Sequence, residues 1–416
     1  MKEAAATSVL SPRWENLWTF AVSSLTSLSF DARKTLTSSS LDPLKTFTDI
    51  RRNLNLLDGA RSRYIRWVNR VLQLHQGQNL EEFRIRFHIP KLSSYSSDVN
   101  KWIDFALKNS VKRLELNLGD RLAMNPFAKN YTFPLGALQV SPIKSLTDIE
   151  LKCIDVTGEV LEYILFNCTS LERLCLECSR CHVDLNVSGL PLKLKILEIV
   201  CCPSIKYINI SAVNLQSFKC IGPEMSVSFE NFPRLVEASF GAGFSKYVVH
   251  NFRQLSASLS RLKSLVMEID FLDDIGLMHM PVLSHLKYLE LIVDIPSDES
   301  LLYFAPFIRA SPFLHRLVVK VDWDGNSMCD SMREPKDCPP HRCLKVVELL
   351  GYAGNPGDNE FAMYVMKSAV SLEKIVIDPC NPGTKQSIDE IEAARMCARW
   401  LKLRVGPGAG FKFELR

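Results

Sequence analysis

The sequence has no apolar run long enough to cross a membrane. A spanning helix needs about 18 or more consecutive apolar residues, and no stretch of the 416 residues approaches that length. The first ten residues, MKEAAATSVL, also lack the uninterrupted apolar core of a secretory signal. We therefore expect no membrane partner and a location in the cytoplasm or the nucleus.

An excess of charge of one sign is also lacking. The formal net charge is only +4, from 50 lysines and arginines against 46 aspartates and glutamates. Proteins that bind nucleic acid by electrostatics carry a much stronger positive excess. The composition therefore predicts no nucleic-acid partner.

The cysteines also lack the regular spacing of a disulfide framework, although cysteine is not rare in the sequence. Thirteen cysteines, an odd number, are scattered through apolar runs such as LCLECSRCH and IVCCPSI. This distribution favours reduced, buried thiols over a disulfide framework. An extracellular alternative is kept open by N-glycosylation sequons at Asn130, Asn167, Asn186 and Asn209.

The motifs of common enzyme classes are missing. The sequence contains no G-x-x-x-x-G-K-[ST], no H-E-x-x-H and no G-x-S-x-G. The glycine-rich GPGAGF at 406–411 is followed by only five residues, too few for a helix whose N-terminus could hold a phosphate. We predict a protein that is not an enzyme, with no catalytic residues and no cofactor.

Two cysteine clusters leave a zinc alternative open. The first consists of Cys175, Cys178, Cys181 and His182. It begins inside a predicted strand, where a zinc site would compete with the sheet for its backbone. The second consists of Cys329, Cys338, His341 and Cys343, in a polar segment whose two prolines are equally consistent with an ordinary turn. For both clusters the structural alternative is favoured, so no metal is expected.

What dominates the sequence is a repeat. The pattern L-x-x-L-x-L, with conservative replacements, recurs twelve times, at intervals of roughly 20 to 35 residues that resemble the leucine-rich-repeat period. The copies are LEEFRI at 80, VKRLEL at 111, LTDIEL at 146, LERLCL at 171, LKILEI at 194, LQSFKC at 215, LVEASF at 235, LKSLVM at 262, LKYLEL at 286, LHRLVV at 314, LKVVEL at 344 and LEKIVI at 372.

The pattern predicts one architecture. Residues four and six of each copy point to one side of a short strand, and residues three, five and seven to the other. Because one copy cannot bury its apolar side alone, neighbours must stack. The fold class is therefore α/β, a leucine-rich-repeat solenoid with a parallel β-sheet on the concave side, helices and loops on the convex side, and a short helical N-terminal region.

The segments outside the copies supply the helices. Apolar residues at helical spacing predict helical returns at 157–170 and 300–312, and an amphipathic helix at 58–77. A further helix is predicted at 98–110, with Asp98 as its cap.

The register makes one prediction of its own. The third positions of the first four copies alternate in sign, as neighbouring rungs of a parallel sheet would favour. They are Glu82, Arg113, Asp148 and Arg173.

Without catalysis, the solvent-facing side of the sheet is the candidate binding face for a protein partner. We expect it to combine acidic and apolar side chains. The acidic positions are Glu115, Glu150, Glu198, Glu290 and Glu348, and the apolar ones are Ile196, Val200, Ile221, Ile292 and Leu350.

The beginning of the chain resembles a known family. ATSVLSPRWENLWTF at 6–20 is similar to the last part of a plant F-box, A-x-x-x-S-V-L-S-x-R-W-x-x-L-W. RYIRWVNRVLQLHQGQNLEEFRIRF and DVNKWIDFALKNSVKRLELNL resemble the region that joins F-box to repeats in plant F-box/LRR proteins, and LKVVELLGYAGNPGDNEFAMYVMKSAVSLEKIVIDP resembles their FBD-like end. The front half of an F-box, which opens with L-P-x-x-[IL]-L, does not precede the matched segment, so we expect a truncated F-box.

The resemblance implies a domain order. We expect an F-box remnant at 1–31, a linker and capping helix at 32–79, the solenoid at 80–343 and an FBD-like end at 344–416. It also implies the substrate-receptor subunit of an SCF-type ubiquitin ligase, which binds a Skp1-like adaptor if its F-box is complete and a target protein through the repeats. The matching adaptor-binding positions are Val9, Leu10, Trp14, Leu17 and Trp18. Because a one-helix remnant would bury too little surface to hold the adaptor alone, we expect the tryptophans of this chain to pack on the 58–77 helix and cap the solenoid. The alternative to the ligase receptor is a free-standing leucine-rich-repeat scaffold.

Overall fold

The structure is a computed structural model of the chain. It describes residues 25–32, 47–77, 79–87, 92–119, 130–141, 143–180, 183–188, 193–229, 233–270, 280–296, 299–324, 334–380, 386–405 and 410–416. The chain divides into two compact units, Met1–Ala212 and Val213–Arg416. Both units are built from the same repeated strand.

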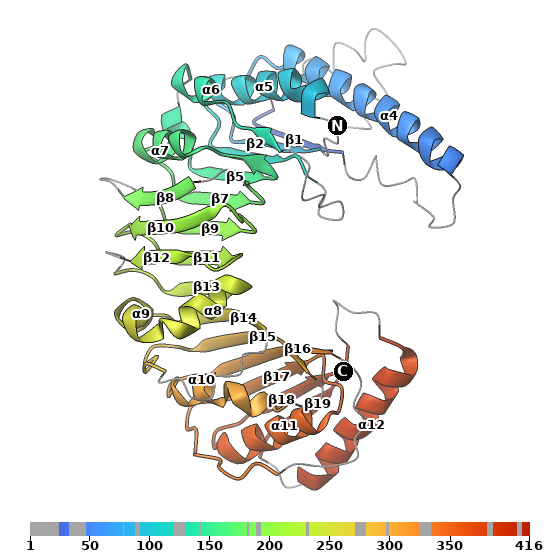
Figure 1. Cartoon of the computed structure of the whole chain (residues 1–416), viewed down its shortest axis with the longest axis vertical. Coiled ribbons are helices and arrows are strands. Elements are labelled where there is room, and N and C mark those ends of the chain that lie inside the picture. The colour runs from blue at the N-terminus through green and yellow to red at the C-terminus, as the bar shows by residue number, and fades with distance from the viewer. Residues whose placement is uncertain are drawn as a thin grey trace. The chain divides into compact units, whose positions relative to one another are not determined.

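The first unit contains a parallel sheet in the order β1-β2-β3-β5-β7-β9 (Figure 1). Its strands are β1 (Ser27–Asp31), β2 (Glu82–Arg86), β3 (Arg113–Asn117), β5 (Asp148–Lys152), β7 (Arg173–Glu177) and β9 (Ile196–Val200). The third positions pair in sequence, Glu82 with Arg113, Arg113 with Asp148, and Asp148 with Arg173. The predicted register and its alternating charges are therefore confirmed.

The second unit repeats this arrangement in the order β11-β13-β14-β15-β16-β17-β18-β19. Its strands are β11 (Ser217–Ile221), β13 (Glu237–Gly241), β14 (Ser264–Asp270), β15 (Tyr288–Pro296), β16 (Arg316–Asp324), β17 (Val346–Leu350), β18 (Lys374–Asp378) and β19 (Lys412–Leu415). All neighbouring pairs in this order are parallel. The leucine-rich-repeat prediction is confirmed for this unit as well.

The core follows the motif. Residues one, four and six of all twelve copies are buried, for example Leu286, Leu289 and Leu291 in the copy that contains β15. Full burial of such a side chain contributes about 1.5–3 kcal/mol. The repeat therefore supplies one continuous apolar layer behind the sheet of each unit.

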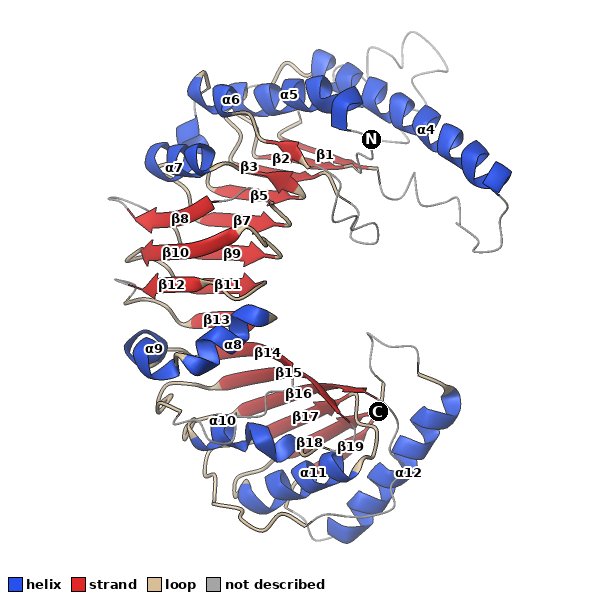
Figure 2. Ribbon diagram, in the orientation of Figure 1, coloured by secondary structure: helices blue, strands red, loops and turns tan. Residues whose placement is uncertain are grey.

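Helices and short strands cover that apolar layer in the first unit (Figure 2). The helices are α4 (Phe47–Leu74), α5 (Leu92–Lys108), α6 (Leu135–Gln139), η2 (Ile143–Ser145) and α7 (Gly158–Asn167). The short strands are β4 (Tyr131–Thr132), β6 (Ile154–Asp155), β8 (Val183–Ser188) and β10 (Ile205–Ser211). The predicted return at 157–170 is confirmed as α7, whose N-cap Thr157 accepts a hydrogen bond from the Val160 amide at 3.4 Å.

The second unit is covered in the same way. Its elements on this side are β12 (Ser226–Phe229), α8 (Gly243–His250), α9 (Phe252–Leu259), η4 (Leu301–Phe304), α10 (Ala305–Arg309), α11 (Pro356–Ser368) and α12 (Ile388–Val405). The predicted helical return at 300–312 corresponds to η4 followed by α10.

The amphipathic helix predicted at 58–77 is confirmed as part of α4. Tyr64 stacks on Phe87 at 4.9 Å and donates a hydrogen bond to the Phe30 carbonyl at 2.9 Å. Trp67 meets Phe30 edge-on at 5.3 Å. These contacts attach α4 to β1 and to Phe87, the residue that follows β2.

The predicted helix at 98–110 is longer than expected, and its cap was assigned wrongly. The helix α5 begins at Leu92, so Asp98 lies inside it. The Asp98 carboxylate instead accepts a hydrogen bond from the Asn69 amide at 2.9 Å. Asn69 in turn accepts one from Trp102 Nε1 at 2.7 Å, so this polar group joins α5 to α4.

Candidate interaction surface

Each unit has one sheet face that its helices leave uncovered, called the open face below. It carries the side chains at motif positions three, five and seven, opposite the buried leucines. All ten residues predicted for the binding face stand at these positions. They are Glu115, Glu150, Ile196, Glu198 and Val200 in the first unit, and Ile221, Glu290, Ile292, Glu348 and Leu350 in the second.

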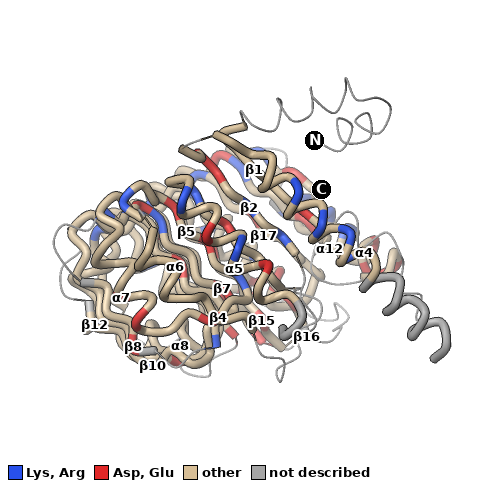
Figure 3. The backbone as a smooth tube through the Cα atoms, turned by 90° about the horizontal axis from the view of Figure 1, so that it is seen from above, with Lys and Arg blue, Asp and Glu red and all other residues tan. Residues whose placement is uncertain are grey.

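In the first unit the open face is a lattice of ion pairs. Glu115 accepts hydrogen bonds from both Arg84 and Arg86. Arg173 contacts Asp148 at 3.2 Å and Glu150 at 2.9 Å. Basic and acidic positions are interleaved along these strands (Figure 3). The carboxylates expected to make this face acidic are therefore neutralised within the face.

Further contacts extend the lattice. Arg173 also contacts Glu198. Lys152 contacts Glu150 and Glu177, and both of these distances are 2.9 Å. Burial alone would raise the pKa of Glu150, but hydrogen bonds from Arg173 and Lys152 bring that pKa below its ordinary value. For Asp148 the effect of burial, which raises the pKa, is larger than the lowering effect of Arg173, so the pKa of Asp148 is raised. The first unit therefore presents a fixed pattern of paired charges on its open face.

Arg173 connects more carboxylates than its neighbours do, so its removal is a test of the lattice. We expect Arg173→Ala to lower the free energy of unfolding by about 1–2 kcal/mol, because three half-buried carboxylates lose their shared cation. The loss should shrink as salt is raised, since added ions screen the remaining repulsion. Urea unfolding at low and high salt measures both effects; an equal loss at both would count against an electrostatic lattice.

In the second unit the open face mixes charge with apolar side chains. Glu290 accepts a hydrogen bond from Tyr288 and contacts Lys320 at 2.6 Å. Lys320 pairs in register between Ile292 and Leu350. The two predicted apolar residues thus flank a cation on the exposed side of the sheet. Arg316 similarly contacts Glu348.

Sequence reasoning missed the cations of both faces. It selected carboxylates and aliphatic residues and left out their basic partners. The missed residues are Arg84, Arg86, Lys152, Arg316 and Lys320, whereas Arg173 was placed in the alternating third-position column but not in the binding face. All stand at motif positions three, five or seven, so the register itself was the signal that could have found them.

The predicted adaptor-binding residues Val9, Leu10, Trp14, Leu17 and Trp18 lie outside the described residues. The same holds for Cys181, His182 and Cys329 of the two cysteine clusters, and for residues 406–409 of the glycine-rich tail.

Two described members of the cysteine clusters, His341 and Cys175, are held inside the fold. His341 Nδ1 accepts a hydrogen bond from the Leu344 amide at 3.1 Å, and Nε2 lies 2.9 Å from the Ser311 carbonyl oxygen. Burial raises the pKa of the Cys175 thiol to about 12, which disfavours the thiolate that zinc needs. Within the described ranges no group of three or more potential ligand residues is arranged to hold a metal ion.

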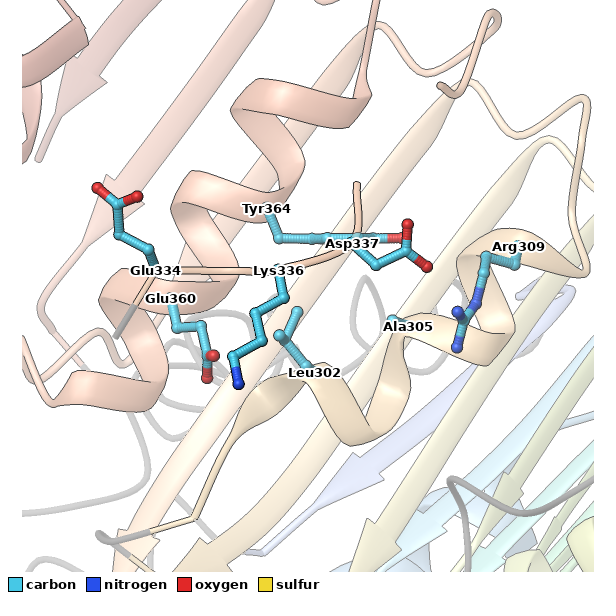
Figure 4. Close-up of a pocket in the computed structure, with 8 residues that line it drawn as sticks. All are labelled: Leu302, Ala305, Arg309, Glu334, Lys336, Asp337, Glu360 and Tyr364. Atoms are coloured by element: carbon cyan, nitrogen blue, oxygen red, sulfur yellow. The ribbon is translucent and has the colours of Figure 1, made fainter. Parts of the chain in front are cut away.

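A cavity of about 610 Å³ lies on the helix-covered side of the second unit (Figure 4). Residues from η4 and α10, from α11 and from the segment before β17 line it. They are Leu302, Ala305, Arg309, Glu334, Lys336, Asp337, Glu360 and Tyr364. Glu360 accepts a hydrogen bond from Ser300 at 2.6 Å. Charges of both signs line the cavity, so it selects no single ligand chemistry.

Parallel strands in register, a leucine layer behind them and one open face define a leucine-rich-repeat solenoid. Residues 135–403 match the family model described as At1g61320/AtMIF1, LRR domain. Since this match spans more than half of the chain, the protein belongs to that leucine-rich-repeat family.

The chain is also similar to curated plant proteins over most of its length. The chain is 23% identical to the F-box/FBD/LRR-repeat protein At4g26340 of Arabidopsis thaliana, over 91% of this chain and 88% of that protein. It is 25% identical to the FBD-associated F-box protein At4g10400 of the same plant, over 90% and 87% of the two chains. These similarities support membership of the plant F-box/FBD/LRR group.

None of the described helices combines the length and the apolar character that crossing a bilayer requires.

Proposed function

We propose that this protein is the substrate-receptor subunit of an SCF-type ubiquitin ligase. In this proposal the segment at 6–20 binds a Skp1-type adaptor through Val9, Leu10, Trp14, Leu17 and Trp18, and the open faces bind the protein to be ubiquitinated. The receptor performs no chemistry itself. It raises the effective concentration of the target lysine at the ubiquitin-charged enzyme.

Two features together support this proposal. The relatives named as F-box proteins align over most of this chain's length. The repeats present open faces of fixed charge pattern, which suit recognition of a folded or extended protein. No disulfide joins two of the described cysteines, which is consistent with action in the cytoplasm or the nucleus.

Co-purification with a plant Skp1-type adaptor tests the ligase role. We expect the full chain, co-expressed with the adaptor, to elute with it in one-to-one ratio. Trp14→Ala combined with Trp18→Ala should weaken the complex at least tenfold, because large aromatic side chains commonly dominate such interfaces. Ile292→Glu on the open face should leave adaptor binding unchanged.

Two other outcomes would count against the ligase role. One is a chain that elutes without the adaptor, and the other is a complex that tolerates both tryptophan changes. Either result would favour the alternative of a free-standing leucine-rich-repeat scaffold.

A further inference from the structure

A row of basic residues runs along the edge of the second unit at which the strands begin. Motif position two directly precedes each strand, and in four successive copies it is occupied by Lys263, Lys287, His315 and Lys345. Backbone hydrogen bonds place these residues side by side: the Lys287 amide donates to the Lys263 carbonyl, His315 to Lys287, and Lys345 to His315, each at 2.8–2.9 Å. All four residues are exposed.

In the first unit the residues at motif position two carry a different pattern of charge. There position two carries Glu81, Lys112, Thr147, Glu172 and Lys195. Lys112 contacts Glu81 at 2.7 Å and Lys195 contacts Glu172 at 2.8 Å. Opposite charges on neighbouring rungs stabilise a sheet, and like charges there destabilise it.

The basic row lacks this compensation. Lys345 contacts Glu373 at 2.7 Å at one end of the row. Among the described residues, Lys263 and Lys287 have no carboxylate partner, and Lys287 lies 5.1 Å from the centre of the Phe313 ring. Neighbouring like charges destabilise the isolated chain. Such charges are expected at a site where a bound ligand supplies the missing negative charge.

The surface beside the row is shaped to receive a ligand. A depression of about 280 Å³ is lined by Lys263, Ser284, His285, Lys287 and Phe313. Phe313 is 47% exposed although it is a large apolar residue. Its ring offers an apolar contact next to two ammonium groups.

The dimensions and the overall charge favour a polypeptide as the ligand. Neighbouring strands lie about 4.8 Å apart, so the four-residue row spans about 14 Å. In an extended peptide, side chains on one face recur every ~6.8 Å, so three alternating acidic residues cover the same length. Nucleic-acid-binding domains usually have a pI above about 9, whereas this chain has a pI of about 8.3.

We propose that the basic row at Lys263, Lys287, His315 and Lys345 is a docking site for an acidic, extended peptide segment of a partner protein. This site is separate from the open faces and does not depend on the ligase role. Carboxylate or phosphoserine side chains of the segment pair with the row, and an apolar side chain packs on Phe313.

Fluorescence anisotropy with defined probes tests the proposal. The probes are a fluorescein-labelled octapeptide of alternating glutamate and serine, its form with every serine phosphorylated, and a labelled octauridylate. At low salt we expect the full chain to bind at least one peptide more tightly than the octauridylate. Lys263→Glu combined with Lys287→Glu should weaken peptide binding at least tenfold. Lys206→Glu, an exposed lysine of β10, should change it less than twofold.

Measurement of Tm separates a docking role of the basic row from a purely structural one. Lys287→Glu places a carboxylate beside Lys263, like the opposite-charge pairs of the first unit, so it should leave Tm unchanged or raise it by about 1–2 °C while it weakens peptide binding. A clear fall in Tm would show that the row is not repulsive. Failure of both peptides to bind, unchanged binding by the double variant, or tighter binding of octauridylate that the double variant abolishes would overturn the proposal.

Discussion

Replacing Leu197 by aspartate is expected to unfold the first unit, whereas the same substitution at its neighbour Ile196 is expected to be tolerated. Leu197 is fully buried at motif position four of β9. A carboxylate there has no hydrogen-bond partner and leaves part of the leucine volume empty. We expect a loss of at least about 4 kcal/mol in the free energy of unfolding, or failure to fold.

Ile196 provides the matched control. It stands at position three on the open face and pairs in register with Arg173. An aspartate at this position can reach water and a cation, so the change should cost less than about 1 kcal/mol. Urea unfolding followed by circular dichroism measures both variants. Similar costs at the two positions would mean that the inward and outward sides of β9 are assigned wrongly.

The second large effect is expected at Asp358, in the first turn of α11. The Asp358 carboxylate is almost completely buried and accepts hydrogen bonds from the amides of Ala353, Gly354 and Asn355 at 2.8, 2.9 and 3.3 Å. Asp358→Ala would remove the acceptor of all three donors. Because buried unpaired donors are costly, we expect a loss of about 3–5 kcal/mol.

The exposed Asp389, in the first turn of α12, is the control for Asp358. Asp389→Ala loses only a favourable helix-dipole interaction and should cost less than about 1 kcal/mol. Thermal unfolding of the two variants checks the contrast. Equal, small costs would show that the three amides find other acceptors.

The pH dependence of Asp358 has a defined sign. Burial raises its pKa from 3.8 to about 7, against the lowering effect of the three amides. Between these two values the folded state binds a proton that the unfolded state has lost. The contribution of Asp358 is therefore fully present below about pH 4 and is lost as pH rises to about 7. The stability of the natural protein relative to Asp358→Asn should fall over this interval.

The parts of the fold that could be predicted are those encoded locally. The alternation of apolar and outward-facing residues within each six-residue motif determines which side of a strand is buried. The strands that begin at Glu82 and Tyr288 could therefore be predicted from their motifs alone. The strand β1 was missed although LTSLSF at 25–30 fits the pattern and Leu28 and Phe30 are buried. In that case the signal was present and was not counted as a copy.

Other features depend on contacts between residues distant in sequence. Arg84 and Glu115 are 31 residues apart, and only the stacking of β2 on β3 brings them together. The strands β8 and β10 were not predicted, because their formation depends on the parallel pairing of VDLNVS with IKYINIS. The open face was therefore located from sequence, while its charge balance required the structure.

The open faces, and not the helix-covered side, are proposed to recognise protein partners. The direct test compares the full chain with two variants, Ile292→Glu on the open face and Phe166→Glu on α7, where Phe166 is 84% exposed. Each is purified with its adaptor from plant cells in which the proteasome is inhibited, and the bound proteins are quantified by mass spectrometry. We predict that Ile292→Glu loses partners that Phe166→Glu retains. Retention of all partners by Ile292→Glu, with their loss from Phe166→Glu, would contradict the account.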